Sequence, residues 1–342
     1  MGISAENLRA HVHKLAAQIG ERNVFRPQAL RQAAEYVEQV WFEQGYEVVH
    51  YLYDVKGERW ANLEVSRYGK ERPSEIILIG AHYDSVVGSP GANDNSSGAA
   101  ALLELSSRIS GWLPGRTVRF VAFVNEGLPF SQTSQMGSRV YAQTACQRGD
   151  DIRAMISLET IGYYSNKRGS QHFPPLFNFF YPSRGNFIMF VSNLRSRALL
   201  RRAVAAFRAH SDFPVGGVSA FGALSGVGWS DHSPFWSKGY RALMVTDTAP
   251  YRYPYYHIAQ DTPDRVNYEA MACVTEEAAR GCLRPLAEEL GLKARQFFGV
   301  LRVTVTGGPV SPPLFETMAV LGRERCFKRI ATTMEMLHKL SS

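Results

Sequence analysis

The sequence lacks several features that mark well-known classes of protein. Its four cysteines, in 342 residues, have neither CxxC nor zinc-ribbon spacing, so we expect free thiols rather than a disulfide framework or a cysteine-ligated zinc site. No GxSxG pentad is present, which disfavours a serine hydrolase built on a nucleophile elbow. No Walker motif or dinucleotide-binding glycine pattern follows a predicted strand, which disfavours those nucleotide-binding enzymes.

Long apolar runs and targeting signals are also missing. No window approaches the roughly 18 apolar residues of a transmembrane helix, so we expect no membrane partner. The amino-terminal residues do not show the basic segment and apolar segment of a secretory signal. We therefore expect a cytoplasmic protein, or a secreted one if a signal was removed before this numbering begins.

The composition is that of a globular protein with an uneven distribution of charge. Hydrophobic residues make up 45% of the chain and charged residues 20%, which is typical of a folded domain. The net charge is +7, but residues 293–342 hold eight Lys and Arg against three Asp and Glu, so most of the excess lies in this tail. A solvated basic helix accounts for the arginines of Ser192–His210, and we expect no nucleic-acid partner.

Apolar runs and helical patterns alternate along most of the chain. Continuous apolar runs are typical of strands buried on both faces. The predicted strands are Tyr46–Tyr53, Trp60–Val65, Ile76–Gly80, Val118–Val124, Ile152–Leu158, Phe187–Val191 and Ala242–Val245. Their alternation with amphipathic helices predicts an α/β fold with a mixed, mostly parallel central sheet and helices on both faces. We assign this fold to residues 1–292.

Residues 293–342 are predicted to form a basic carboxyl-terminal extension. Phe298–Val305 is interpreted as a short strand, and a helix with apolar residues at near-helical spacing follows it. The apolar face of this helix is expected to pack on the body of the protein or to join a second subunit in a homo-oligomer.

Histidine and carboxylate side chains gather where the predicted strands end. His82 and Asp84 directly follow one buried strand, Glu126 and Glu159 follow two others, and Asp94 opens a helix. Catalytic groups of α/β folds lie just beyond the carboxyl ends of strands, and imidazole and carboxylate groups are ligands of zinc. A turn or a helix cap would explain each cluster alone, but their joint placement indicates a metal site with an acid–base group.

The order of these clusters resembles the co-catalytic zinc aminopeptidases of metallopeptidase family 28. The matching motifs are His82-Tyr83-Asp84, Gly91-Ala92-Asn93-Asp94-Asn95, Val124-Asn125-Glu126, Leu158-Glu159, Ser230-Asp231-His232 and Tyr256-His257 with Asp261-Thr262-Pro263-Asp264. The resemblance covers roughly residues 5–290. It implies a zinc-aminopeptidase fold and a zinc-dependent metallo-exopeptidase that removes N-terminal residues from a peptide substrate.

The resemblance also implies a set of metal ligands. Asp94 would bridge two zinc ions. His82 and Glu159 would complete the first site, and His257 would serve the second. A cis peptide bond between Asp94 and Asn95 is expected from the same comparison.

Two further residues receive catalytic roles from the resemblance. Glu126 would be the general base that takes a proton from the attacking water, and a carboxylate of this kind can return the proton to the leaving amine. Asp84 would hold the imidazole of His82 in place, as outer carboxylates commonly do for ligating histidines.

The sequence departs from the family at one position. The family usually reads Asn-Glu-Glu-Pro-Pro-Phe, whereas residues 125–130 read Asn-Glu-Gly-Leu-Pro-Phe, so Gly127 replaces a metal-ligating Glu. The second site would keep only two protein ligands, which leaves open one zinc ion or two. It also leaves open a catalytically weak or inactive family member that binds peptides without cleaving them. A glutaminyl cyclase is disfavoured, because those single-zinc relatives use the site that is broken here.

An aromatic cluster lies close in sequence to His257. Its members are Trp229, Tyr251, Tyr253, Tyr255 and Tyr256. They are candidates to line a pocket for an apolar substrate side chain, although core or lid positions explain them equally well.

Overall fold

A computed structural model describes residues 2–173, 182–281, 301–306 and 314–341. The chain divides into two units, Met1–Cys282 and Leu283–Ser342. The predicted boundary between residues 292 and 293 lies outside the described residues. None of the helices in the described ranges has the length and apolar character needed to span a bilayer.

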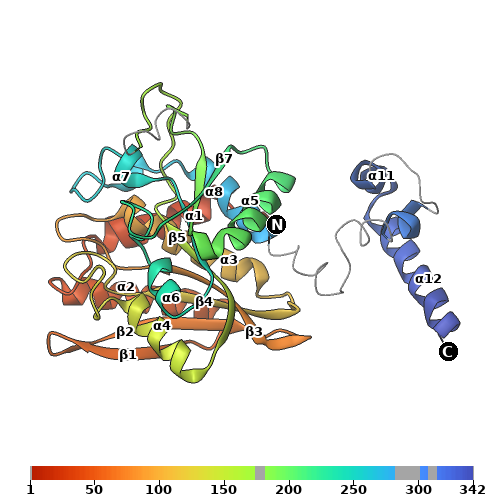
Figure 1. The fold of residues 1–342 in the computed structure, drawn as a ribbon, viewed down its shortest axis with the longest axis horizontal. Helices are drawn as coiled ribbons and strands as arrows, with labels where there is room; N and C mark the ends of the chain where they lie inside the picture. Colours follow the sequence, from red (N-terminus) through yellow and green to blue (C-terminus); the bar gives the residue numbers. More distant parts are fainter. Residues whose placement is uncertain (1, 174–181, 282–300, 307–313, 342) are drawn as a thin grey trace. The chain divides into compact units, whose positions relative to one another are not determined.

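The first unit is built on a mixed sheet, which has eight strands in the described residues (Figure 1). The strands are β1 (Val49–Val55), β2 (Glu58–Arg67), β3 (Arg72–His82), β4 (Arg116–Phe123), β5 (Asp151–Glu159), β6 (Ile188–Asn193), β7 (Val215–Ala220) and β8 (Ala242–Thr246). Their order is β1-β2-β4-β3-β5-β8-β6-β7. Strands β4, β3, β5 and β8 are parallel to one another. The pairs β1–β2, β2–β4 and β6–β8 are antiparallel. The predicted mixed, mostly parallel sheet is confirmed.

Helices cover both faces of this sheet. One face packs against α1 (Ala5–Val12), η1 (His13–Ile19), α2 (Pro27–Glu43), α3 (Gly98–Ile109), α5 (Arg197–His210) and α8 (Tyr268–Gly281). The other face packs against α4 (Gly137–Arg148) and α6 (His232–Ser237). Shorter helical segments are η2 (Ala92–Ser97), η4 (Leu194–Ser196), α7 (Ala249–Arg252) and η5 (Pro263–Arg265).

The alternation of side chains along the central strands explains why both faces are covered. On β4, Phe120 and Ala122 belong to the larger core, while Val121 and Phe123 belong to the core under α4 and α6. Successive residues of a strand point to opposite faces, so a strand that is apolar at every position needs a layer on each side. This burial holds the carboxyl ends of β3, β4 and β5 next to one another.

The described parts of the second unit are helices, two of which meet at Gly322. Residues 301–306 form a helix, followed by α11 (Leu314–Leu321) and α12 (Arg323–Ser341). The prediction of a strand over Phe298–Val305 is therefore wrong for residues 301–305, and the rest of that range lies outside the described residues. Leu301 and Val305, one helical turn apart, share a small core with Cys326 and Ile330. This packing favours a helix, although the β-branched residues of the segment favour a strand.

Candidate active site

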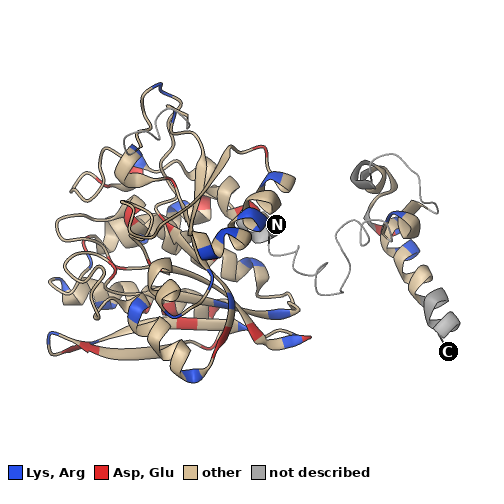
Figure 2. Cartoon of the chain, in the orientation of Figure 1, with Lys and Arg blue, Asp and Glu red and all other residues tan. Residues whose placement is uncertain are grey.

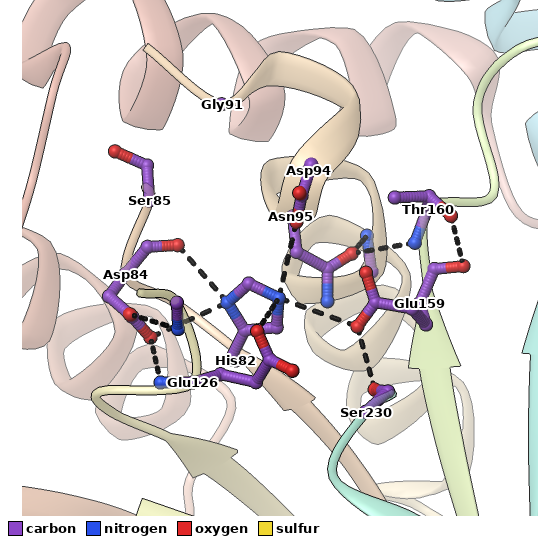
Figure 3. A network of polar contacts seen from close by, with 12 residues as sticks. His82, Asp84, Ser85, Gly91, Asp94, Asn95, Glu126, Glu159, Thr160 and Ser230 are labelled. Carbon is purple, nitrogen blue, oxygen red and sulfur yellow. Dashed lines mark hydrogen bonds and ion pairs between the residues drawn. The ribbon is translucent and has the colours of Figure 1, made fainter. Parts of the chain in front are cut away.

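The site lies at the carboxyl ends of three neighbouring parallel strands (Figure 3). His82 is the last residue of β3, Glu159 is the last residue of β5, and Glu126 follows β4, which pairs with β3. Asp94 comes from η2, in the loop that leaves β3. The structure thus brings together His82, Asp94, Glu126 and Glu159 from separate parts of the chain.

The imidazole of His82 points into a group of carboxylates. Its Nε2 atom lies 3.3 Å from Asp94 Oδ1, 3.4 Å from Glu159 Oε2 and 3.7 Å from Glu126 Oε2. This nitrogen is buried and makes no hydrogen bond. Ligand atoms of His82, Asp94 and Glu159 lie within 4.8 Å of one another. One nitrogen and two carboxylate oxygens in this arrangement fit a metal ion such as zinc, which would satisfy the orphaned Nε2.

Asp94 faces two imidazoles with its two oxygens. Its Oδ1 faces His82, and its Oδ2 lies 2.9 Å from Nε2 of His257. The peptide bond between Asp94 and Asn95 is cis, as the resemblance implies. His257 therefore joins the group through Asp94, on the side away from His82.

Asp84 connects His82 to the segment that carries Glu126. Nδ1 of His82 lies 3.2 Å from the backbone oxygen of Asp84 and 3.4 Å from its Oδ1. The Asp84 carboxylate also accepts hydrogen bonds from the backbone N–H groups of Glu126 and Gly127, each at 3.2 Å. One buried carboxylate therefore orients a candidate ligand and the candidate base together.

Hydrogen bonds also fix the other two candidate ligands. Ser230 Oγ donates to Glu159 Oε2 at 2.7 Å. The carboxylate of Asp261 accepts from the backbone N–H groups of Asn93 at 2.8 Å and Asp94 at 3.1 Å. Sequence reasoning singled out the motifs containing Ser230 and Asp261 but assigned these two residues no role.

Backbone conformation marks the same strand ends. Asn125, Thr160 and His257 have φ values of 59°, 46° and 63°, in the left-handed region that non-glycine residues rarely adopt. Asn125 precedes Glu126, and Thr160 follows Glu159. Such conformations cluster at functional sites, where the surrounding structure holds them in place.

The electrostatics of the site follow from the crowding of acids around His82. Burial alone lowers the pKa of His82, but Glu159 and Glu126 outweigh it, so this pKa lies well above its usual value. Burial raises the pKa of Glu126 well above its usual range, and neighbouring carboxylates including Glu159 add to the rise. Burial also opposes ionisation of Asp94, yet His257 and His82 hold the pKa of Asp94 below its usual value. The groups are therefore strongly coupled, as is common at functional sites.

The known proteins that this chain matches agree with this geometry. The family model for peptidase family M28 matches residues 62–280. The chain belongs to peptidase family M28. It is 36% identical over 282 residues to the uncharacterized protein YfbL of Escherichia coli, a match that covers 80% of this chain and 86% of YfbL.

Solved M28-like folds extend the comparison to three dimensions. A zinc aminopeptidase from Bacillus subtilis, BSAP, superposes with a TM-score of 0.66 and 14% sequence identity, over 83% of this chain and 95% of BSAP. At this level of identity the likeness concerns the fold.

A different family matches the carboxyl-terminal part of this M28 chain. The family model for the anticodon binding domain matches residues 265–334. A glutamate–tRNA ligase of Dehalococcoides mccartyi is 51% identical over 74 residues, which are 22% of this chain and 15% of the ligase. The chain therefore spans only a small part of that relative.

Gly127 stands at the position where the family pattern has a metal-ligating Glu. A Cβ atom built there would lie 3.4 Å from Val86 Cα and 3.6 Å from Asp84 Oδ2, which are ordinary contact distances. The backbone therefore admits a Cβ atom at this position, although the sequence does not supply the Glu. Among the described residues, Asp94 and His257 are the candidate ligands of a second ion.

An apolar cavity of about 220 Å³ opens beside the M28 centre. Glu126 and Glu159 line one part of it, and Trp229, Tyr251 and Tyr256 are among its other walls. Apolar residues complete it, including Met189, Val191, Val218, Leu224 and Met244. Of the predicted aromatic cluster, Tyr253 is instead buried and donates to Asp261 Oδ1, and Tyr255 packs edge-on against Tyr253.

His232 lies apart from the candidate ligands. Its Nε2 pairs with the backbone oxygen of Val227 at 2.8 Å, and its ring packs edge-on against Trp236. Burial lowers the pKa of His232 to about 4. Asp231, beside it, is fully buried, and burial raises the pKa of Asp231 to about 7. Only Ser230 of this motif touches a candidate ligand.

Proposed function

We propose that this chain is an aminopeptidase that works with one tightly held zinc ion, bound by His82, Asp94 and Glu159. The observation that carries the proposal is the buried, unpaired Nε2 of His82, which faces the carboxylates of the other two residues at 3.3 and 3.4 Å. Three protein ligands with an open position are typical of catalytic zinc. The half of the centre around His257 has two, because Gly127 carries no ligand.

The chemistry divides between the ion and the protein. Zinc, when bound, polarises the scissile carbonyl and acidifies the attacking water. Glu126 accepts the proton of that water and delivers it to the leaving amine, a role suited to a buried carboxyl with a raised pKa. Asp84 keeps Glu126 in position through the backbone N–H groups of residues 126 and 127.

The apolar cavity supports a preference for apolar N-terminal residues. It adjoins Glu126 and Glu159, and aliphatic and aromatic side chains form most of its walls. A charged substrate side chain would lose its hydration there without gaining a partner. Leucyl and phenylalanyl anilides are therefore expected to be cleaved faster than lysyl or glutamyl anilides, and equal rates would contradict this role of the cavity.

The experiment combines zinc analysis with turnover of aminoacyl anilides. We expect about one zinc per chain and measurable hydrolysis by the wild-type protein. The Glu126→Gln variant should keep its zinc and lose about 10²–10⁴-fold in kcat. A wild-type protein with neither zinc nor turnover would contradict the proposal and would favour a family member that binds peptides without cleaving them.

We further propose that the carboxyl-terminal unit binds structured RNA. Its support is the similarity of residues 265–334 to the anticodon binding domain. On α12, Arg325 and Lys328 are exposed one turn apart, and Phe327, between them in the sequence, is 60% exposed. Cations for phosphates and an exposed ring for stacking are what RNA binding uses. This proposal departs from our sequence-based expectation of no nucleic-acid partner.

The two basic helices of the chain allow a matched test, and Figure 2 shows their basic residues. Binding of unfractionated transfer RNA to the full chain is measured across salt concentrations. Arg325→Glu with Lys328→Glu on α12 should weaken binding and lower the salt slope by about 2, since each lost phosphate contact removes about 1. Arg197→Glu with Arg201→Glu on α5 should leave binding unchanged. No RNA binding by wild-type, or loss only in the α5 variant, would contradict the proposal.

A further inference from the structure

A buried arginine lies behind the metal centre. Arg22 follows η1 and is fully inaccessible to solvent. Its guanidinium donates hydrogen bonds to the backbone oxygens of Leu15, Gly20, Tyr83, Pro90 and Gly91 and to the hydroxyl of Ser96. All three of its nitrogens are used. A charged side chain is rarely this deeply buried unless its donors are satisfied.

These hydrogen bonds lie close in sequence to two residues of the candidate centre, Asp84 and Asp94. Tyr83 O accepts from Nε at 2.6 Å, immediately before Asp84. Gly91 O and Ser96 Oγ accept from Nη2 at 3.1 and 2.7 Å, on either side of Asp94. One side chain thus connects both ends of the loop that carries Asp84 and Asp94.

The backbone of Arg22 adds to this connection. Ser85 donates its N–H to the Arg22 carbonyl at 2.9 Å, and its hydroxyl accepts the Arg22 N–H at 3.1 Å. Figure 3 shows Ser85 and Gly91 on the loop that holds Asp84 and Asp94. The loop after β3 is therefore fastened to the amino-terminal helices at several points.

The charge of Arg22 also matters for an acidic centre. Burial lowers the pKa of Arg22 to about 10, while Asp84, Asp261 and Asp94 oppose that shift, so the guanidinium is charged at neutral pH. All the hydrogen bonds of its guanidinium are accepted by neutral oxygens, so it acts on these carboxylates through space. Its positive charge opposes the repulsion among acids that must stay ionised to hold a cation.

We propose that Arg22 is a positioning residue of the metal centre, which holds residues 83–96 so that Asp84 orients His82 and Asp94 faces it. The proposal rests on the proposed zinc site for its functional meaning. Arg22 makes no hydrogen bond with a candidate ligand's side chain and does not line the cavity, so it acts through the loop that it holds and through its charge. An outer group of this kind typically contributes 10–100-fold in metal affinity.

Arg119, whose side chain is 12% exposed, provides a control for the cost of removing a largely buried arginine. It lies on β4 and pairs with Glu64 and Asp150, away from the loop after β3. Arg22→Met and Arg119→Met each remove a guanidinium but keep a long apolar stem. Should Arg22→Met not fold, Arg22→Lys, which keeps the charge but loses the forked donors, takes its place.

Two measurements on the full chain test the role. Hydrogen exchange without metal should be faster within residues 83–96 in the Arg22 variant, and unchanged there in Arg119→Met. Zinc affinity, from competition with a chelator below the unfolding temperature of each variant, should fall about 10–100-fold for Arg22→Met and stay near wild-type for Arg119→Met.

The two measurements separate the possible failures. Unchanged exchange within residues 83–96 would overturn the positioning role, whatever the metal results. Faster exchange with zinc affinity equal to wild-type would also overturn it, since Arg22 would then be purely structural. If wild-type binds no zinc but exchange responds as expected, the zinc proposal fails while the hold of Arg22 on the loop stands.

Discussion

The two halves of the proposed metal centre share Asp94 and differ in almost everything else. The inner half has His82 and Glu159, both buried, with Glu159 held by Ser230. The outer half has His257, whose side chain is 34% exposed, and Gly127 stands at the position where the family pattern has a carboxylate. The inner half therefore has three ligands fixed by the protein, whereas the outer half has two.

On the proposed ligand set, this contrast explains how a metal centre of this kind loses one ion and keeps the other. The candidate inner ligands come from β3, β5 and η2. His82 and Asp94 are held by hydrogen bonds that oxygens of Asp84 and Asp261 accept, and Glu159 is held by one that Ser230 donates. None of these hydrogen bonds uses a side chain at position 127. Loss of the Glu at that position therefore removes an outer ligand without disturbing the inner ones.

The largest expected effect comes from comparing one ligand of each half. Glu159→Gln should release the zinc and lower kcat/KM by at least about 100-fold, because a direct ligand contributes more than an outer group. His257→Gln should retain about one zinc per chain and lose less than about tenfold in kcat/KM. Zinc analysis and anilide hydrolysis measure both. Equal loss of zinc in the two variants would mean that the halves act as one two-metal site.

Much of the fold could be predicted because the central strands are buried on both faces. Continuous apolar runs located β3, β4 and β5 to within a few residues. Strand β7 was not predicted, since Gly216 and Gly217 occupy two of its six positions and its residues are only partly buried. The helix at residues 301–306 differs from the predicted strand, because its valines and threonines favour strands but tertiary packing decides the structure.

The candidate site was predictable where its residues lie at the ends of strands that are neighbours in the sheet. His82, Glu126 and Glu159 end neighbouring strands, so their meeting follows from sheet order. Arg22 offered no such signal, since a lone arginine in a loop resembles any surface residue. Its role depends on acceptors from η1, the β3 loop and η2, which only the folded chain brings together.

A smaller effect is expected from restoring the missing ligand. Gly127→Glu should raise the zinc content from about one to about two per chain, because the backbone admits a Cβ atom there and Asp94 and His257 would gain a third partner. Gly127→Gln is the matched control, since it has the same size without a carboxylate. The second ion should bind at least about tenfold more tightly to the Glu variant. If both variants bind one ion, the number of bound ions is limited by the geometry of the outer half and not by its number of ligands.

The smallest effect is the pH dependence of zinc binding to the inner half. The carboxylates raise the pKa of His82, so in the metal-free protein its imidazole carries a proton that zinc must displace. Because protons and zinc compete for this nitrogen, affinity should rise with pH, by about tenfold per unit below the pKa of His82. Calorimetry at about pH 6 in buffers of different ionisation enthalpy should show at least one proton released per zinc bound. His257→Gln should release the same number, because His257 lies in the other half. A larger release by wild-type than by this variant would show that the ion also displaces a proton from His257, which would remove the distinction between the halves.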